Sequence, residues 1–165
     1  MKPTKQTETA FLASGCFWGT QYHLNKLPGV ELTLVGYMGG TLDHPSYTEV
    51  KTGTTGHVET VKVVFDPTRV SFEEVLRLYF ETHDFTQVGG QGPDIGSQYR
   101  SVIFYTDEKQ KAVAEKLIGE LESKGYKVAT ALEPAITFWI GEDYHQQYYD
   151  RKGEKPYCHI YRKIF

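Results

Sequence analysis

The spacing of apolar residues along the chain predicts a series of short strands. Five runs are rich in apolar or β-branched residues and are flanked by glycine, proline or polar residues: 9–13, 30–37, 57–65, 100–105 and 135–140. Two stretches between them, residues 39–56 and 84–98, are rich in glycine and show no period, which predicts long loops. Because long loops inside a compact domain are often functional, we expect these two to contribute to a site.

Three other stretches have the spacing of helices. Residues 17–27 are predicted to form the first helix, which a Pro-Gly pair ends. The second begins at Ser71, since Glu74 three residues later completes a capping box. The third covers residues 107–124, with apolar side chains facing inward and Lys and Glu facing water. The second helix has its apolar residues on one stripe: Phe72, Val75, Leu76, Tyr79, Phe80 and His83.

This order of elements predicts the fold class. Strand, helix, strand, strand, helix, strand is the order of a ferredoxin-like βαββαβ core, here with a helix and a strand appended. We therefore expect an α+β protein, a two-layer sandwich of helices against a mixed sheet, with an irregular C-terminal tail from Asp143 onward. No repeat or long linker divides the chain, so we expect one domain over residues 1–165, with mobile tails at about 1–8 and 150–165.

Composition and charge exclude several classes of protein. With 39% apolar and 24% charged residues, the chain has the composition of an ordinary soluble protein. It has 18 Lys and Arg against 21 Asp and Glu, whereas a nucleic-acid binder usually needs a basic excess. No apolar stretch is long enough to span a bilayer, and the first nine residues lack the apolar core of a signal peptide. We expect a cytoplasmic protein, or a mature form already trimmed, that acts as a monomer without nucleic acid or membrane.

The two cysteines, Cys16 and Cys158, are the candidate reactive groups. They are too few for a zinc site of their own. Cys16 falls where the first strand ends and the first helix begins, and the unpaired N–H groups of a helix start favour the nucleophilic thiolate. Phe17 and Trp18, directly after it, can line a small apolar pocket. On these residues alone, a buried structural cysteine and two core aromatics remain an equal alternative.

Eight segments of the chain together resemble the A-type peptide methionine sulfoxide reductases, in the order that the family has them. Such a series is far more specific than one five-residue motif. The segments are Gly15-Cys16-Phe17-Trp18-Gly19, Gly36-Tyr37-Met38-Gly39-Gly40, Pro45-Ser46-Tyr47, Thr55-Gly56-His57-Val58-Glu59, His83-Asp84, Gln91-Gly92-Pro93-Asp94-Ile95-Gly96, Gln98-Tyr99-Arg100-Ser101 and Tyr144-His145-Gln146-Gln147-Tyr148.

The resemblance implies a role for each of several residues in the reduction of methionine S-sulfoxide. Cys16 would attack the sulfoxide sulfur and Glu59 would protonate its oxygen. Two tyrosines, Tyr47 and Tyr99, would donate hydrogen bonds to that oxygen. The remaining site residues would be Asp94, which orders the site, and Phe17 and Trp18, which receive the substrate methyl group.

The chemistry agrees with these residue types. A sulfoxide sulfur is a poor electrophile until its oxygen is protonated, so a thiolate, an acid and oxygen-directed donors are needed together. Glu59 can be the acid only if it keeps its proton near neutral pH, as a carboxyl in an apolar pocket does. Without the resemblance, Glu59 would be a solvated strand residue, the tyrosines surface groups and Asp94 a turn former.

The resemblance also implies how the enzyme is recycled. Attack leaves Cys16 as a sulfenic acid, which a second thiol converts to a disulfide. Cys158 is the other cysteine, and Lys51 stands where many members of the family have another. A Cys16–Cys158 disulfide reduced by thioredoxin is therefore implied, with oxidised proteins and free methionine sulfoxide as substrates and with neither a metal nor an organic cofactor.

Two other functions remain open on the residues alone. A Cys–His hydrolase or acyl transferase would use His57 as the base for Cys16, and it would need a His within hydrogen-bond reach of the sulfur. A binding module without catalysis would hold methionine-like side chains between Phe17 and Trp18.

Overall fold

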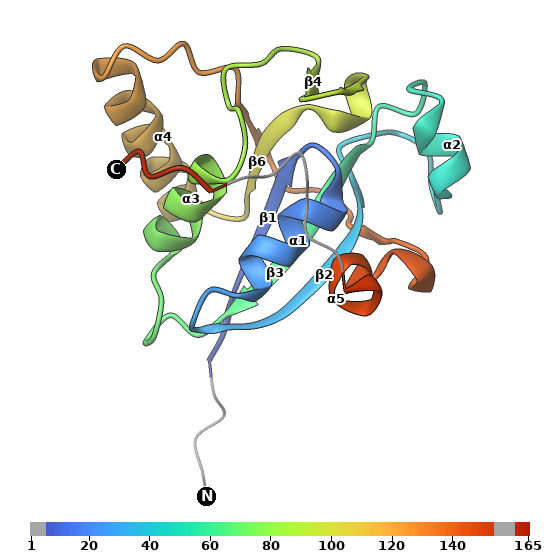
Figure 1. The fold of residues 1–165 in the computed structure, drawn as a ribbon, viewed down its shortest axis with the longest axis horizontal. Helices are drawn as coiled ribbons and strands as arrows, with labels where there is room; N and C mark the ends of the chain where they lie inside the picture. Colours follow the sequence, from blue (N-terminus) through green and yellow to red (C-terminus); the bar gives the residue numbers. More distant parts are fainter. Residues whose placement is uncertain (1–5, 154–160) are drawn as a thin grey trace, which may run out of the picture.

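The computed structural model describes residues 6–153 and 161–165, and a six-stranded mixed sheet lies at its centre (Figure 1). The strand order is β7-β6-β1-β3-β2-β8; β6 and β7 are parallel and all other neighbours are antiparallel. Ala13 lies opposite Val102 and Tyr37 opposite Glu59 in this register. The strands are β1 (Glu8–Ser14), β2 (Val30–Met38), β3 (Val58–Phe65), β6 (Ser101–Tyr105), β7 (Ala131–Pro134) and β8 (Trp139–Ile140).

Three helices cover one face of the sheet. The α+β class with helices against a mixed sheet is thereby confirmed. The core between them contains Leu12, Val61 and Ile103 from the strands, and the opposite sheet face carries a second cluster that includes Met38 and Phe104. Successive residues of each strand therefore point to different clusters, as the pleat requires. The covering helices are α1 (Phe17–Asn25), α3 (Phe72–Glu81) and α4 (Glu108–Ser123).

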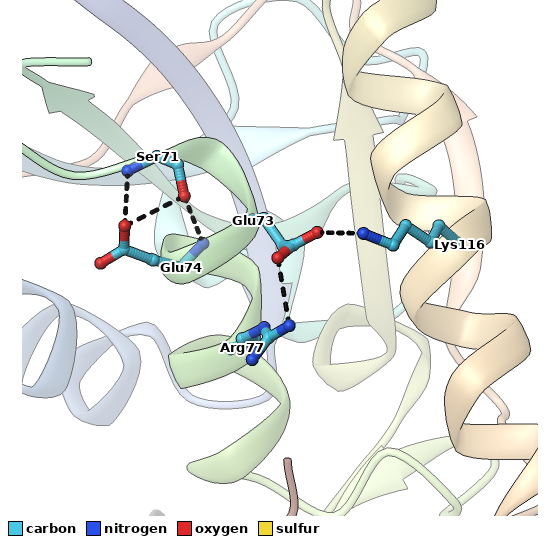
Figure 2. Close-up of polar contacts among 5 residues, drawn as sticks. All are labelled: Ser71, Glu73, Glu74, Arg77 and Lys116. Atoms are coloured by element: carbon cyan, nitrogen blue, oxygen red, sulfur yellow. Dashed lines mark hydrogen bonds and ion pairs between the residues drawn. The ribbon is translucent and has the colours of Figure 1, made fainter. Parts of the chain in front are cut away.

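The second predicted helix begins where the sequence placed it. The Ser71 hydroxyl accepts the Glu74 N–H and the Glu74 carboxylate accepts in return, so the capping box is confirmed (Figure 2). On the same helix, Glu73 contacts Arg77 at 3.1 Å and reaches across to Lys116 of α4 at 2.8 Å. The Lys116 hydrogen bond lowers the pKa of Glu73. The Glu73–Lys116 ion pair links α3 to α4. Because it lies near the surface, it adds little to the stability of the fold.

The two predicted loops contain short elements that the sequence analysis missed. The first holds α2 (Tyr47–Lys51), whose Ser46 and Glu49 form a capping box that is visible in the sequence. The second holds a hairpin of β4 (Gly90–Gln91) and β5 (Asp94–Ile95), followed by the 3₁₀ turn η1 (Ser97–Tyr99). Elements this short have no detectable period.

The predicted strand at 135–140 was wrong in its bounds. The chain forms β7 before residue 135, and only residues 139–140 of the predicted strand pair, as β8. Between β7 and β8 the chain crosses the second face of the sheet, where Phe138 packs on Phe11. The prediction of an irregular tail from Asp143 was also wrong within the described residues. That segment holds the 3₁₀ turn η2 (Asp143–His145) and α5 (Tyr148–Lys152). No described helix has the length and apolar character needed to cross a membrane.

Candidate active site

Cys16 occupies the N-cap position of α1, as the sequence predicted. Gly15 before it has a φ of 93°, a conformation that favours glycine and turns the chain sharply from β1 into the helix. The hydroxyl of Thr20 contacts Ser14 Oγ at 2.6 Å and the Cys16 carbonyl at 3.4 Å, which joins the two sides of this turn. The Cys16 side chain is partly exposed, so a substrate can reach it.

Glu59 lies on β3 directly under the start of α1. Its side chain is only 2% exposed, and its Oε1 accepts the backbone N–H of Phe17 at 3.2 Å. Burial raises the pKa of Glu59 from 4.5 to about 8; the Phe17 hydrogen bond opposes the rise and the charge of Asp94 adds to it. Glu59 is therefore a protonated acid at neutral pH, adjacent to the residue that follows Cys16.

Tyr47 and Tyr99 come together from two of the missed elements, α2 and η1. Tyr47 is the first residue of α2 and Tyr99 the last of η1, and their hydroxyls share a hydrogen bond. Burial raises the pKa of both, and the charges of Glu59 and Asp94 raise it further. Both hydroxyls therefore keep their hydrogen. Cys16 is close enough to Tyr47 to affect its titration, so the five polar residues that the sequence predicted form one cluster.

The two aromatic residues after Cys16 differ in exposure. Phe17 is 1% exposed and belongs to the core, with its ring 5.8 Å from that of Tyr37. Trp18 is only partly buried, and its ring stacks on Tyr148 of α5 with 3.7 Å between centroids and 9° between planes. Trp18 therefore remains partly accessible although Tyr148 covers one face of its ring, whereas Phe17 is buried in the core.

The sequence analysis assigned no role to His145, although it lies among the site aromatics. Its ring is 1% exposed, and its centroid lies 5.2 Å from Phe17 and 4.5 Å from Tyr47. Its Nδ1 accepts the indole N–H of Trp18 at 3.0 Å, which fixes the Trp18 ring. Burial lowers the pKa of His145, against the raising effect of the Glu142 charge, so the ring is neutral at neutral pH.

Glu142 is the second site residue without an assigned role. Its carboxylate accepts hydrogen bonds from Tyr37 Oη at 2.9 Å, the Tyr47 backbone N–H at 3.1 Å and Tyr144 Oη at 3.0 Å. Burial alone would raise the pKa of Glu142, but these hydrogen bonds outweigh it and lower the pKa. Residues 144–148, close to Glu142 in the chain, are one of the segments that resemble the family. No local sequence pattern, however, links Glu142 to Tyr47.

His57 is unsuited to the alternative role of base for Cys16. Its Nδ1 accepts the Gly40 N–H at 3.1 Å and its Nε2 contacts the Leu42 carbonyl at 2.7 Å, so both ring nitrogens bind backbone groups of one loop. The ring is 2% exposed. This geometry disfavours the hydrolase hypothesis.

The remaining predicted residue, Cys158, lies outside the described residues. Within residues 6–153 and 161–165, no three His, Cys, Asp or Glu side chains gather as a metal site would require.

Comparison with known proteins agrees with the geometry of the site. Residues 8–165 match the family model described as peptide methionine sulfoxide reductase. The chain belongs to this family. The reductase is 47% identical to the MsrA of Methanoculleus marisnigri over 156 residues, which cover 93% of this chain and 95% of the relative. It is 44% identical to that of Saccharolobus solfataricus over 154 residues, 93% of this chain and 87% of the relative.

Solved structures agree over most of the chain. Mxr1 from Saccharomyces cerevisiae in reduced form superposes on the reductase with a TM-score of 0.88 at 31% identity, covering 98% of this chain and 96% of Mxr1. MsrA of Corynebacterium diphtheriae gives 0.80 at 36% identity, covering 93% and 78%. Mxr1 in complex with Trx2 gives 0.64 at 22% identity, covering 98% and 94%, which compares the fold alone. The reductase is thus an oxidoreductase, a peptide-methionine (S)-S-oxide reductase.

Proposed function

We propose that Cys16 is the nucleophile of the reductase and Glu59 its acid. The observation that carries this proposal is the buried Glu59 carboxyl, which keeps its proton to about pH 8 and contacts the N–H of the residue after Cys16. A protonated carboxyl at that position can give its proton to a sulfoxide oxygen held above the sulfur of Cys16. Asp94 supports this state because its charge raises the pKa of Glu59.

Tyr47 and Tyr99 complete the site for the oxygen. Both hydroxyls keep their hydrogen, and they already bind each other, so a sulfoxide oxygen that enters between them exchanges one hydrogen bond for others. The reaction then transfers the oxygen and one proton to Cys16, which becomes a sulfenic acid. The Cys16 sulfur loses two electrons and the substrate sulfur gains them, which releases methionine.

Trp18 is proposed to receive the substrate methyl group together with Phe17, the aromatic pair that the family resemblance implies. If the methyl group lies on Trp18 while the oxygen meets Glu59 and the tyrosines, a single configuration at sulfur fits. The S epimer is the one that the family resemblance implies, both in proteins and as the free amino acid, since each epimer has its own reductase.

The substitution Cys16→Ser tests the nucleophile. A serine hydroxyl is far from ionised at neutral pH and attacks sulfur poorly, so the variant should no longer reduce a peptide that contains methionine S-sulfoxide. Mass spectrometry of the peptide after incubation with dithiothreitol measures the loss of one oxygen. Wild-type enzyme with the R epimer provides the control for stereochemistry. Reduction by Cys16→Ser at the wild-type rate would refute the mechanism.

We further propose that Cys158 resolves the sulfenic acid as a Cys16–Cys158 disulfide and that thioredoxin reduces it. The support is the Mxr1 structure in complex with Trx2, together with the position of Cys158 as the second cysteine of the chain. This chemistry requires no metal or organic cofactor.

The fold also supports the proposal, because its core elements carry the residues of the site. We assign β1, α1, β2, β3, α3 and β6 to a ferredoxin-like core, because their sheet order is β6-β1-β3-β2 and they follow one another as strand, helix, strand, strand, helix, strand. The whole chain would then be one catalytic domain that acts as a monomer.

A further inference from the structure

A buried hydrogen-bond network is centred on the hydroxyl of Ser101, the first residue of β6. Ser101 Oγ lies 2.9 Å from Tyr79 Oη, 2.8 Å from His83 Nε2 and 2.7 Å from Thr130 Oγ1. The other nitrogen of the His83 ring, Nδ1, lies 2.6 Å from the carbonyl oxygen of Tyr79. Ser101, Tyr79 and His83 are 4%, 1% and 6% exposed, so water does not substitute freely for these contacts.

This network joins the backbone segments that carry two of the proposed catalytic groups. The Tyr79 hydroxyl lies 2.7 Å from the carbonyl of Ala13, three residues before Cys16. Ser101 follows Tyr99 by two residues. The network therefore connects the end of β1, the start of β6 and α3 beneath the site, and a change in it would move Cys16 relative to Tyr99.

The hydrogens available to the network determine the charge of His83. Ala13 and Tyr79 each contribute a carbonyl that can only accept, and the five contacts whose distances are given above need a hydrogen each. The hydroxyls of Tyr79, Ser101 and Thr130 bring one hydrogen apiece, so His83 must supply the other two.

The assignment follows step by step. The Tyr79 hydroxyl must donate to the Ala13 carbonyl, so the Tyr79–Ser101 contact needs the hydrogen of Ser101. Ser101 then has none left, and both its lone pairs accept, one from Thr130 and one from His83 Nε2. The Nδ1 atom of His83 also needs a hydrogen, because it faces a carbonyl. A neutral ring would leave one of these buried contacts with no hydrogen between its atoms.

We propose that His83 is an imidazolium cation at neutral pH and acts as a positioning residue for Cys16 and Tyr99. The proposal rests on the proposed function only for what those two residues do. It concerns a histidine whose ring nitrogens contact Tyr79 and Ser101 and that acts through these two residues.

The surroundings of His83 favour a positive charge. Glu81 and Asp84 lie on either side of it in sequence, and all three line a cavity of about 580 Å³. Among the described residues, the other titratable groups that line this cavity are Tyr126 and Arg162. Two carboxylates against one guanidinium give these residues a net negative charge, which offsets the burial of an imidazolium. On the other side of the ring, burial raises the pKa of Tyr79, which keeps its hydroxyl hydrogen for the Ala13 carbonyl.

Nitrogen NMR of the histidine rings tests the charge directly, because a ring nitrogen with hydrogen differs in chemical shift from one without. At neutral pH, both nitrogens of His83 should carry hydrogen. Two other buried histidines are matched controls. His57 accepts the Gly40 N–H at Nδ1, and His145 accepts the Trp18 N–H at Nδ1, so each should be neutral. A His83 ring with one bare nitrogen at neutral pH would overturn the proposal.

Two substitutions separate the hydrogen count from a general loss of packing. Tyr79→Phe removes two contacts and one hydrogen, so Ser101 can donate to His83 Nε2, and the His83 ring should become neutral. Thr130→Val removes one contact and one hydrogen, so His83 should stay a cation. The reverse pattern, or no change in Tyr79→Phe, would contradict the count.

The positioning role is tested by the rate of the first turnover. Glu59 titrates at about pH 8, so rates are compared at one neutral pH, where both variants keep Glu59 protonated. We expect formation of the Cys16 sulfenic acid to be on the order of tenfold or more slower in Tyr79→Phe than in Thr130→Val, since small displacements of reacting groups are costly. Equal rates in both variants, with His83 neutral only in Tyr79→Phe, would refute the positioning role while leaving Cys16 as nucleophile untouched.

Discussion

Burial of a single carboxyl couples the stability of this enzyme to pH. Glu59 keeps its proton to about pH 8 in the folded chain, whereas the unfolded chain releases it near pH 4.5. Between these values the folded state holds more protons than the unfolded state, so stability falls as pH rises. The contribution is fully present below about pH 4.5 and lost by about pH 8. A site that needs a buried acid therefore weakens the fold at alkaline pH.

Glu59→Gln should remove this dependence on pH. As pH rises from about 4.5 to about 8, the free energy of unfolding of the variant should increase relative to that of wild type by a few kcal/mol in all. The reason is that the amide has no proton to release. Urea denaturation of both proteins across this range measures the difference. A difference that stays constant with pH would mean that Glu59 is ionised in the folded protein.

The same substitution should slow the chemical step. Without a proton to give, Glu59→Gln should reduce the single-turnover rate at neutral pH by about 10²-fold or more, the usual effect of a positioned general acid. The gap should narrow at low pH, where solvent can supply the proton, as long as Cys16 remains ionised. A rate within a few-fold of wild type at neutral pH would assign the acid to another residue.

At the scale of residues, the sequence could predict which residues belong to the candidate site better than it could predict their surroundings. The resemblance named Glu59, but only the sheet explains why it is buried: β3 lies between β1 and β2, and residues 58–61 are buried on both faces. Helix-start chemistry predicted the place of Cys16 from local signals. The roles of Glu142 and His145 could not be predicted in this way, since their partners lie about a hundred residues away in the chain.

Short elements position the two tyrosines that are proposed to bind the sulfoxide oxygen. Tyr47 begins the five-residue helix α2, which is too short to be stable alone. Its own capping box holds the first turn, and Glu142, from a distant part of the chain, accepts the Tyr47 N–H. The capping box could be predicted from Ser46 and Glu49. The Glu142 contact could not, because it depends on how the chain after β8 returns to the site.

A double-mutant cycle tests whether Glu142 acts through Tyr47. Glu142→Ala should slow sulfenic acid formation, and in a Tyr47→Phe background the same change should have a smaller effect, because the hydroxyl to be positioned is already absent. We expect a coupling of about 0.5–3 kcal/mol from the four single-turnover rates, as for residues in one network. Substitution of the exposed Glu115 of α4 provides a matched control. Fully additive effects would show that Glu142 is independent of Tyr47.

Over the whole molecule, the C-terminal part of the chain is attached at two places, one of which is next to the site. Tyr148 of α5 stacks on Trp18, two residues after Cys16. At the other end, the Arg162 N–H donates to the Glu81 carbonyl at 2.7 Å, at the end of α3. Cys158 lies between these attachments in sequence, six residues after Lys152 and four before Arg162. A chain of that length extends to roughly 20 Å from α5, which is enough to reach a residue beside Trp18.

Cys158→Ser should separate the chemical step from recycling. The first turnover should stay close to the wild-type rate, because Cys158 takes no part in the attack on the sulfoxide. Cys16 should then remain a sulfenic acid, which dimedone traps and mass spectrometry detects. Because thioredoxin reduces disulfides, turnover with thioredoxin should fall sharply, whereas dithiothreitol is small enough to reach Cys16 and should still support turnover. If thioredoxin-coupled turnover of the variant matches wild type, Cys158 is not the resolving cysteine, and an outside thiol must reduce the sulfenic acid of Cys16 directly.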